Sequence, residues 1–375
     1  MAAVSQSNDL LKWETTHQAN IGFDLGFLDH ALTLTVDFYA KQTHDMLIPT
    51  PVAGRTGYSQ QWQNIGRVDN KGIEFQFSSK NIDKKDFKWV TDFNISHNKN
   101  SVVDLGLIDF IPVNIPDGWI QDIGRVNIGR PLGEAYGYLF DGIYQLTDFN
   151  WQNGNDPKIP HEDRIYVLND GVVSVAGINV RPGSHKFLDL DGDNKINLDD
   201  DRQAISSSQP LFFGGLRNSF QYKNFDLNLF FEGSYGNEIF NESKFRLEGG
   251  IAHGYMNVSK EFYENHWTLD NPSVRYGDYA DRNPTSYLAS DYYVEDASYI
   301  RLNSLSLGYT LRSKALSTLH LSSARIYVTG NNLYTWTNYS GFDPEVNTGN
   351  ILLSGVDRIS YPRARTILFG IKLAF

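Results

Sequence analysis

ARTILFGIKLAF (364–375) is the stretch of this 375-residue chain that decides the fold. Large apolar residues occupy every second position of it, at Ile367, Phe369, Ile371, Leu373 and Phe375. A period of two is typical of a β-strand with one apolar face. In a soluble sheet such a strand promotes aggregation, whereas in an outer-membrane barrel its apolar face meets lipid and its edge pairs with a neighbour. The stretch therefore predicts an amphipathic strand and leaves both settings open.

The same alternation recurs along the chain in hairpin-like pairs. We predict nine strands, at 18–29, 31–42, 69–80, 86–97, 211–222, 225–235, 298–311, 322–333 and 364–375. Phe and Leu recur on one side of these strands, and the other side carries Asp24, Asp37, Arg217, Asp226, Asn228 and Arg301. The predicted fold class is all-β: an antiparallel transmembrane β-barrel portion of about nine spanning strands.

Loop lengths support this interpretation. Short connections at 29–30, 81–86, 223–224 and 312–321 alternate with long ones at 43–68, 98–210, 236–297 and 334–362. Outer-membrane barrels combine short periplasmic turns with long extracellular loops. We therefore expect 98–210 and 236–297 to be extracellular loop regions, with a short helix near 257–267. Residues 134–145 are strand-like but belong to this external region, because a span there would invert every later loop.

Nine is an odd number, and single-chain bacterial barrels close with an even one. The start of the chain also lacks the charged and apolar regions of a signal peptide. Residues 1–375 are accordingly expected to be the C-terminal portion of a larger barrel, without its plug and signal peptide. The alternative is a soluble or surface-exposed β-sandwich that binds a ligand and has a structural calcium loop.

Composition excludes several functions. The net charge is −11, which disfavours a nucleic-acid partner. The chain has no cysteine, and so neither disulfides nor thiolate metal sites. The sequence contains no HExxH motif, nucleophile elbow or glycine-rich phosphate loop, and we predict that the protein is not an enzyme.

DLDGDNKINLDD (189–200) is the most specific chemical motif. Its oxygen ligands follow the spacing of a twelve-residue calcium loop, and the predicted metal ligands are Asp189, Asp191, Asp193, Lys195 through its backbone carbonyl, Asn197 and Asp200. Asn194 occupies the position where the sharp turn prefers glycine. The expected cofactor is a structural Ca²⁺ that ties an exposed loop together, and the alternative is an acidic turn that holds water.

Six stretches resemble the SusC-like (SusC/RagA) TonB-dependent outer-membrane transporters, in the order of that family's C-terminal barrel. They are LKWETT (11–16), GRPLGEAYGYLFDGIYQ (129–145), PGSHKFLDLDGDNKINLDDDRQAI (182–205), YYVEDASYIRLNSLSLGYTL (292–311), YVTGNNLYTWTNYSGFDPEV (327–346) and YPRARTILFGIKLAF (361–375). The resemblance implies part of a large plugged barrel in the outer membrane of a Gram-negative bacterium. It also implies import of a glycan, oligopeptide or similar nutrient.

The resemblance further implies three partners: a SusD-like surface lipoprotein over the loops, outer-membrane lipid, and the TonB complex, which acts only through the missing N-terminal part. The expected ligand-binding residues are Trp62, Trp119 and Trp151, because aromatic side chains suit both sugar faces and peptide side chains. The alternative role of these three residues is to hold loops together or to form the interfacial aromatic girdle.

Overall fold

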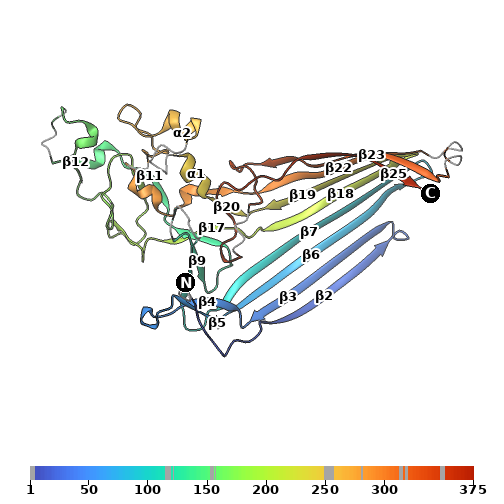
Figure 1. Ribbon diagram of the computed structural model, residues 1–375, viewed down its shortest axis with the longest axis horizontal. Coiled ribbons are helices and arrows are strands. Elements are labelled where there is room, and N and C mark those ends of the chain that lie inside the picture. Colours follow the sequence, from blue (N-terminus) through green and yellow to red (C-terminus); the bar gives the residue numbers. More distant parts are fainter. Residues whose placement is uncertain are drawn as a thin grey trace.

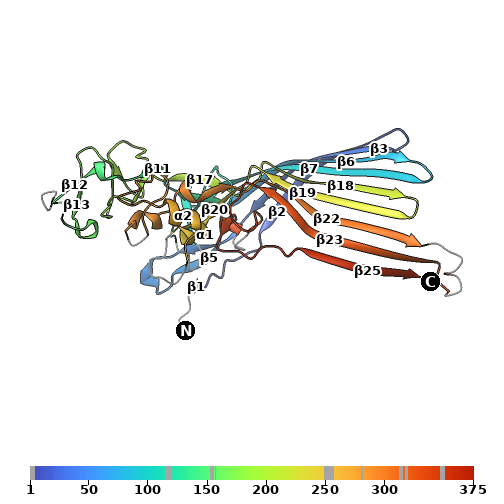
Figure 2. The same ribbon diagram turned by 90° about the horizontal axis from the view of Figure 1, so that it is seen from above.

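The computed structural model describes residues 5–114, 120, 122–152, 156, 158–248, 257–279, 282–311, 316, 320–346 and 351–375. The molecule is elongated (Figure 1). Long strands run side by side to one end, and short strands and helices form a body at the other end. Figure 2 shows the same division from above, with the strands fanning out from the body.

The long strands form one antiparallel sheet of nine, which confirms the predicted strands. In spatial order they are β2 (Thr15–Phe27), β3 (Leu32–His44), β6 (Arg67–Asp83), β7 (Phe87–Asp104), β18 (Phe212–Tyr222), β19 (Phe225–Tyr235), β22 (Tyr299–Leu311), β23 (Ser323–Thr337) and β25 (Thr366–Ala374). Each strand pairs with the next one along the chain that belongs to this sheet. β2 and β25 are therefore the two edges of the sheet.

Strand register separates an apolar face from a polar face. Directly paired residues share a face, and the next residue along a strand lies on the other face. One row of paired residues crosses eight strands as Leu25, Leu34, Phe77, Phe93, Leu216, Phe231, Leu302 and Tyr334. The adjacent row on the opposite face reads Asp24, Thr35, Gln76, Asn94, Gly215, Glu232, Arg301 and Thr335. The sheet is therefore two-faced across nearly its whole width.

The apolar face stays exposed. Ile21, Phe23 and Phe369 are 64%, 55% and 80% exposed, respectively. Among the described residues, no second sheet covers this face, which a β-sandwich would require. The arrangement matches a barrel wall whose apolar side meets lipid.

Aromatic side chains mark both ends of the apolar face. β18 begins with Phe212 and ends with Tyr222, and β19 begins with Phe225 and ends with Tyr235. All four are between 46% and 63% exposed. Ten steps along a strand at about 3.3 Å, tilted by about 40°, span roughly 25 Å, the height of the lipid-facing band of a barrel. The spacing of these residues fits aromatic girdles at the two membrane interfaces.

The body consists of short elements joined by turns. Its strands are β1 (Ser5–Gln6), β4 (Leu47–Pro51), β5 (Gln60–Asn64), β8 (Phe110–Val113), β9 (Gly124–Asn127), β10 (Glu134–Gly137), β11 (Phe140–Ile143), β12 (Phe149–Trp151), β13 (Tyr166–Leu168), β14 (Ser174–Val175), β15 (His185–Phe187), β16 (Lys195–Ile196), β17 (Gln203–Ser207), β20 (Glu238–Asn241), β21 (Val294–Asp296) and β24 (Val356–Asp357). Its α-helices are α1 (Glu242–Leu247) and α2 (Lys260–Asn265). The predicted helix near 257–267 is confirmed as α2. Residues 134–145, in β10 and β11, lie outside the nine-stranded sheet as expected.

The body has its own apolar core, although the sequence suggests only irregular loops there. One cluster includes Leu105, Ile123, Phe240, Tyr293 and Leu353, and a second surrounds Tyr144 and Phe187. Burial of these side chains packs many short segments together over the end of the sheet. No helix among the described residues has both the length and the apolar character that crossing a membrane requires.

Candidate ligand pocket on the polar face

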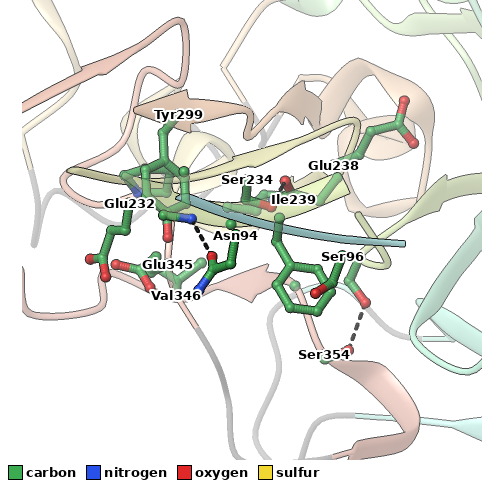
Figure 3. Close-up of a pocket in the computed structure, with 18 of the residues that line it drawn as sticks. Asn94, Ser96, Glu232, Ser234, Glu238, Ile239, Tyr299, Glu345, Val346 and Ser354 are labelled. Atoms are coloured by element: carbon green, nitrogen blue, oxygen red, sulfur yellow. Dashed lines mark hydrogen bonds between the residues drawn. The ribbon is translucent and has the colours of Figure 1, made fainter. Parts of the chain in front are cut away.

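An open pocket of about 610 Å³ lies where the polar face of the sheet meets the body. Strands β6, β7 and β19 contribute six polar side chains to its lining, all from the polar face of the sheet. They are Glu74, Gln76, Asn94, Ser96, Glu232 and Ser234. Figure 3 shows Asn94 among the lining residues together with Tyr299, and Ile239, Val346 and Ser354 are contributed by segments outside the sheet. Its volume falls in the range of small-ligand sites, about 300–1,000 Å³.

A glycine on the polar face, Gly215 of β18, leaves room for this pocket. Gly214 and Gly215 of β18 and Gly233 of β19 all line it. A Cβ atom at Gly215 would lie 2.8 Å from the ring of Phe230, and one at Gly214 would lie 2.2 Å from the carbonyl oxygen of Asn94. The backbone N–H of Gly215 donates to Oδ1 of Asn94 over 2.7 Å (Figure 3). Gly214 and Gly233 belong to the apolar rows, so it is at Gly215 that backbone rather than a side chain forms the floor of the pocket.

A buried arginine fixes one wall of the pocket. Arg301 of β22 is 2% exposed, and it donates hydrogen bonds to Asp343 over 2.7 Å, to Oγ1 of Thr335 over 2.9 Å, and to Glu345. Arg363 donates to the second carboxylate oxygen of Glu345 over 3.0 Å. These contacts hold the segments before and after residues 347–350 against the polar face of the sheet.

Glu232 joins this group of charges. Its Oε1 accepts a hydrogen bond from Nδ2 of Asn303 over 2.8 Å and lies 3.9 Å from Nη1 of Arg301 and 3.8 Å from Nη1 of Arg363. In Figure 3 the side chains of Glu232 and Glu345 extend to the same side of the pocket. No motif in the sequence marks these charges as one group, although SYIRLN and GFDPEV, which supply most of them, both lie in the family-like stretches.

The predicted calcium loop is folded back on itself. Carboxylate oxygens of Asp189, Asp191 and Asp193 lie within 4.8 Å of one another. Asp189 accepts hydrogen bonds from the backbone N–H groups of Gly192 over 2.8 Å and of Asn194 over 2.7 Å. Asn194 has a φ of +65°, the left-handed conformation expected at its position in the loop. The structure thus brings the first three predicted ligands together.

The other end of the loop is closed by a residue that was not predicted. Asp201 is fully buried and accepts hydrogen bonds from the backbone N–H groups of Leu190 over 2.9 Å and of Asn197 over 2.7 Å. Asp200 does not join the three gathered carboxylates. Lys195 lies in β16, and the side chain of Asn197 accepts from the N–H of Asp200 over 3.0 Å. The calcium site remains a prediction, with the carboxylates of Asp189, Asp191 and Asp193 as its best-assembled part.

The three tryptophans lie apart from the pocket or outside the described residues. Trp62 is in β5 and 42% exposed. Trp119 lies outside the described residues. Trp151 is in β12, where the guanidinium of Arg164 lies 4.0 Å from its ring centroid and Tyr166 packs edge-on against it. Neither Trp62 nor Trp151 lines the pocket, and the roles proposed for the three remain predictions.

Comparisons with known proteins agree with this architecture. Residues 1–105 match the family described as "TonB dependent receptor-like, beta-barrel". The chain is 37% identical to TonB-dependent receptor P3 of Formosa agariphila, over 98% of the chain and 35% of that receptor. It is 28% identical to TonB-dependent receptor SusC of Bacteroides thetaiotaomicron, over 98% of the chain and 32% of SusC.

Among solved structures, the fold is similar to that of the RagAB peptide transporter. The TM-score is 0.72 at 23% identity, and the match covers 99% of this chain and 36% of the other chain. The chain thus spans roughly a third of the length of the curated relatives it matches. With the nine-stranded, two-faced sheet, these matches show that the chain belongs to the SusC-like TonB-dependent receptors and forms a portion of their outer-membrane β-barrel.

Proposed function

We propose that this chain is part of the wall and external loops of an outer-membrane importer, and that the pocket on the polar face contacts the imported nutrient. The supporting observation is the position of the pocket: it lies on the face opposite the lipid-facing rows, at the end of the sheet that carries the body. A nutrient that enters a barrel between its loops meets that part of the wall first.

The proposal includes the partners of the whole receptor. A SusD-like surface lipoprotein would cover the external loops, and the TonB complex would supply energy through parts of the receptor outside this chain. Similarity to SusC and to a chain of the RagAB peptide transporter supports this arrangement. The nutrient would be a glycan, an oligopeptide or a similar compound, with Trp62, Trp119 and Trp151 as further contact residues on the loops.

Uptake by the full-length receptor tests this function. The receptor would be restored to a deletion strain, and uptake of a panel of labelled glycans and oligopeptides would be measured. Ser96→Trp fills the pocket from β7, and Ser219→Trp adds the same bulk to the polar face of β18 away from the pocket. We expect Ser96→Trp alone to lower uptake, at equal amounts of receptor in the outer membrane.

Two outcomes would contradict the proposal. Uptake of every compound in the panel that equals uptake by the deletion strain would reject import. Equal uptake by the two tryptophan variants would reject the role of this pocket.

A further inference from the structure

The lining of the pocket is acidic. It includes the carboxylates of Glu74, Glu232, Glu238 and Glu345, and no Lys, Arg or His is among the described residues that line it. The remaining polar lining is neutral, with amides such as Asn94 and hydroxyls such as those of Ser96 and Ser234. A concave site with charges of one sign concentrates the electric field and attracts ligands of the opposite sign.

Neighbouring arginines neutralise this acidity only in part. Arg301 and Arg363 contact Glu232, Asp343 and Glu345, so two guanidinium groups face three carboxylates. The side chain of Arg301 is 2% exposed, whereas those of Glu232 and Glu345 are 24% and 22% exposed. Arg363 is 48% exposed but does not line the pocket. On the pocket side, this group therefore presents the carboxylates of Glu232 and Glu345.

Glu74 of β6 is a further acidic residue of the pocket, separate from the group around Glu232 and Glu345. In the strand register it lies directly opposite Asp37 of β3 on one side and Ser96 of β7 on the other. Like charges in directly paired positions repel one another, and a cation placed beside them relieves that repulsion. Glu238 contributes less, because its Oε2 accepts the backbone N–H of Ser207 over 3.0 Å and its side chain points away from the other labelled residues in Figure 3.

Two further basic side chains lie on the polar face without lining the pocket. The guanidinium of Arg217 of β18 lies 5.6 Å from the ring centroid of Phe230. Lys41 of β3 lines a hollow of about 470 Å³ together with Tyr39, Asn70 and Asn98. It does not line the acidic pocket.

We propose that this pocket binds its ligand through a protonated amine or another cationic group and rejects polyanionic compounds. The inference rests on the proposed function and adds the charge class of the ligand to it. Glu74 would contact the cation from the sheet, and Glu232 and Glu345 would contact it from the opposite wall.

Binding of three capped tetrapeptides to the purified full-length receptor tests the proposal. The peptides are acetylated and amidated and have the sequences Gly-Lys-Gly-Lys, Gly-Ser-Gly-Ser and Gly-Glu-Gly-Glu, so that only the side-chain charge differs. Isothermal titration calorimetry would give each Kd at two salt concentrations. We expect the lysine peptide to bind most tightly and its advantage to shrink as salt rises.

Two variants test whether the preference for the lysine peptide arises in this pocket. Glu74→Gln removes the charge at constant shape, and we expect it to weaken binding of the lysine peptide about two- to fivefold, the effect of one exposed ion pair. Ser96→Lys places a cation opposite Glu74, and it should reduce or reverse the preference. Glu264→Gln in α2, whose side chain is 56% exposed, and Ser219→Lys on β18 are the controls and should leave all three Kd values unchanged.

Equal affinities for the three peptides, or an unchanged preference in both Glu74→Gln and Ser96→Lys, would overturn the assignment. Failure of all three peptides to bind would overturn it as well. A different outcome would contradict the proposed import alone. If the receptor prefers the lysine peptide but restores no uptake to a deletion strain, the charge assignment stands and the transport function is rejected.

Discussion

Nη2 of Arg301 lies 2.7 Å from Oδ1 of Asp343, and the arginine is 2% exposed. The two residues are far apart in sequence, because Arg301 belongs to β22 and Asp343 follows β23. A buried charge is tolerated only when it is paired and hydrogen-bonded. The pair therefore fastens the segment after β23 to the polar face of the sheet, beside the pocket.

Replacing Arg301 by methionine in the full-length receptor tests this fastening. Asp343 would keep its negative charge in a buried place without its guanidinium partner, and breaking a buried pair in this way costs about 3–5 kcal/mol. We expect a clear fall in the temperature at which the receptor loses its heat-modifiable mobility on gels. Arg363→Met is the matched control, because this arginine also binds Glu345 but its side chain is 48% exposed. An exposed pair contributes only about 0–1 kcal/mol, so equal shifts in the two variants would contradict the assignment.

Low pH should weaken the attachment of the segment after β23 to the polar face of the sheet. Burial by itself would raise the pKa of Asp343, but hydrogen bonds from the backbone N–H of Glu345 and from Arg301 outweigh it and bring the pKa below its ordinary value. A carboxyl with a lowered pKa in the folded state contributes stability above its unfolded pKa, about 3.9, and loses it as pH falls through the lowered value. We expect the unfolding temperature to decrease as the pH is lowered below about 4. Asp343→Asn should make this acid limb shallower, and an unchanged limb would refute the role of Asp343.

The strands could be predicted from the sequence because lipid imposes a pattern of period two on each of them. The pattern gives the lipid-facing length but not the full hydrogen-bonded length. The prediction for β7 ends at residue 97, whereas the strand continues to Asp104. Val102, near that end, is 1% exposed in the core of the body. A strand that leaves the membrane and enters a protein core no longer alternates between lipid and lumen, so its end is not marked in the sequence.

The pocket could not be predicted in the same way, because it depends on contacts between distant segments. Arg301 meets Asp343 only after the chain has completed β23 and turned back over the sheet. The floor of the pocket depends on Gly215 of β18 lying opposite Glu232 of β19. The closing residue of the acidic loop lies within three consecutive aspartates at 199–201. The spacing favoured Asp200, whereas Asp201 is the one that is buried.

Calcium binding by the acidic loop can be measured directly. Calorimetric titration of the full-length receptor with Ca²⁺ should show a site that disappears in the double variant Asp189→Ala and Asp193→Ala, because these two residues belong to the gathered carboxylates. Asp199→Ala, an exposed neighbour outside that group, is the control and should retain the site. Calcium binding that is unchanged in the double variant would reject the predicted ligands.

The two faces of β19 allow a test of the membrane orientation with adjacent residues. Leu229 shares the face of Phe231 and lies between the aromatic ends Phe225 and Tyr235, whereas Asn228 lies on the face of Glu232. Arginine on the lipid face near the bilayer midplane costs about 2–4 kcal/mol, but arginine on the lumen side does not meet lipid. We therefore expect Leu229→Arg to reduce both the amount of assembled receptor in the outer membrane and its unfolding temperature, and Asn228→Arg to change either one little. The reverse order would mean that the apolar rows face the lumen, and it would invalidate the placement of the pocket inside the barrel.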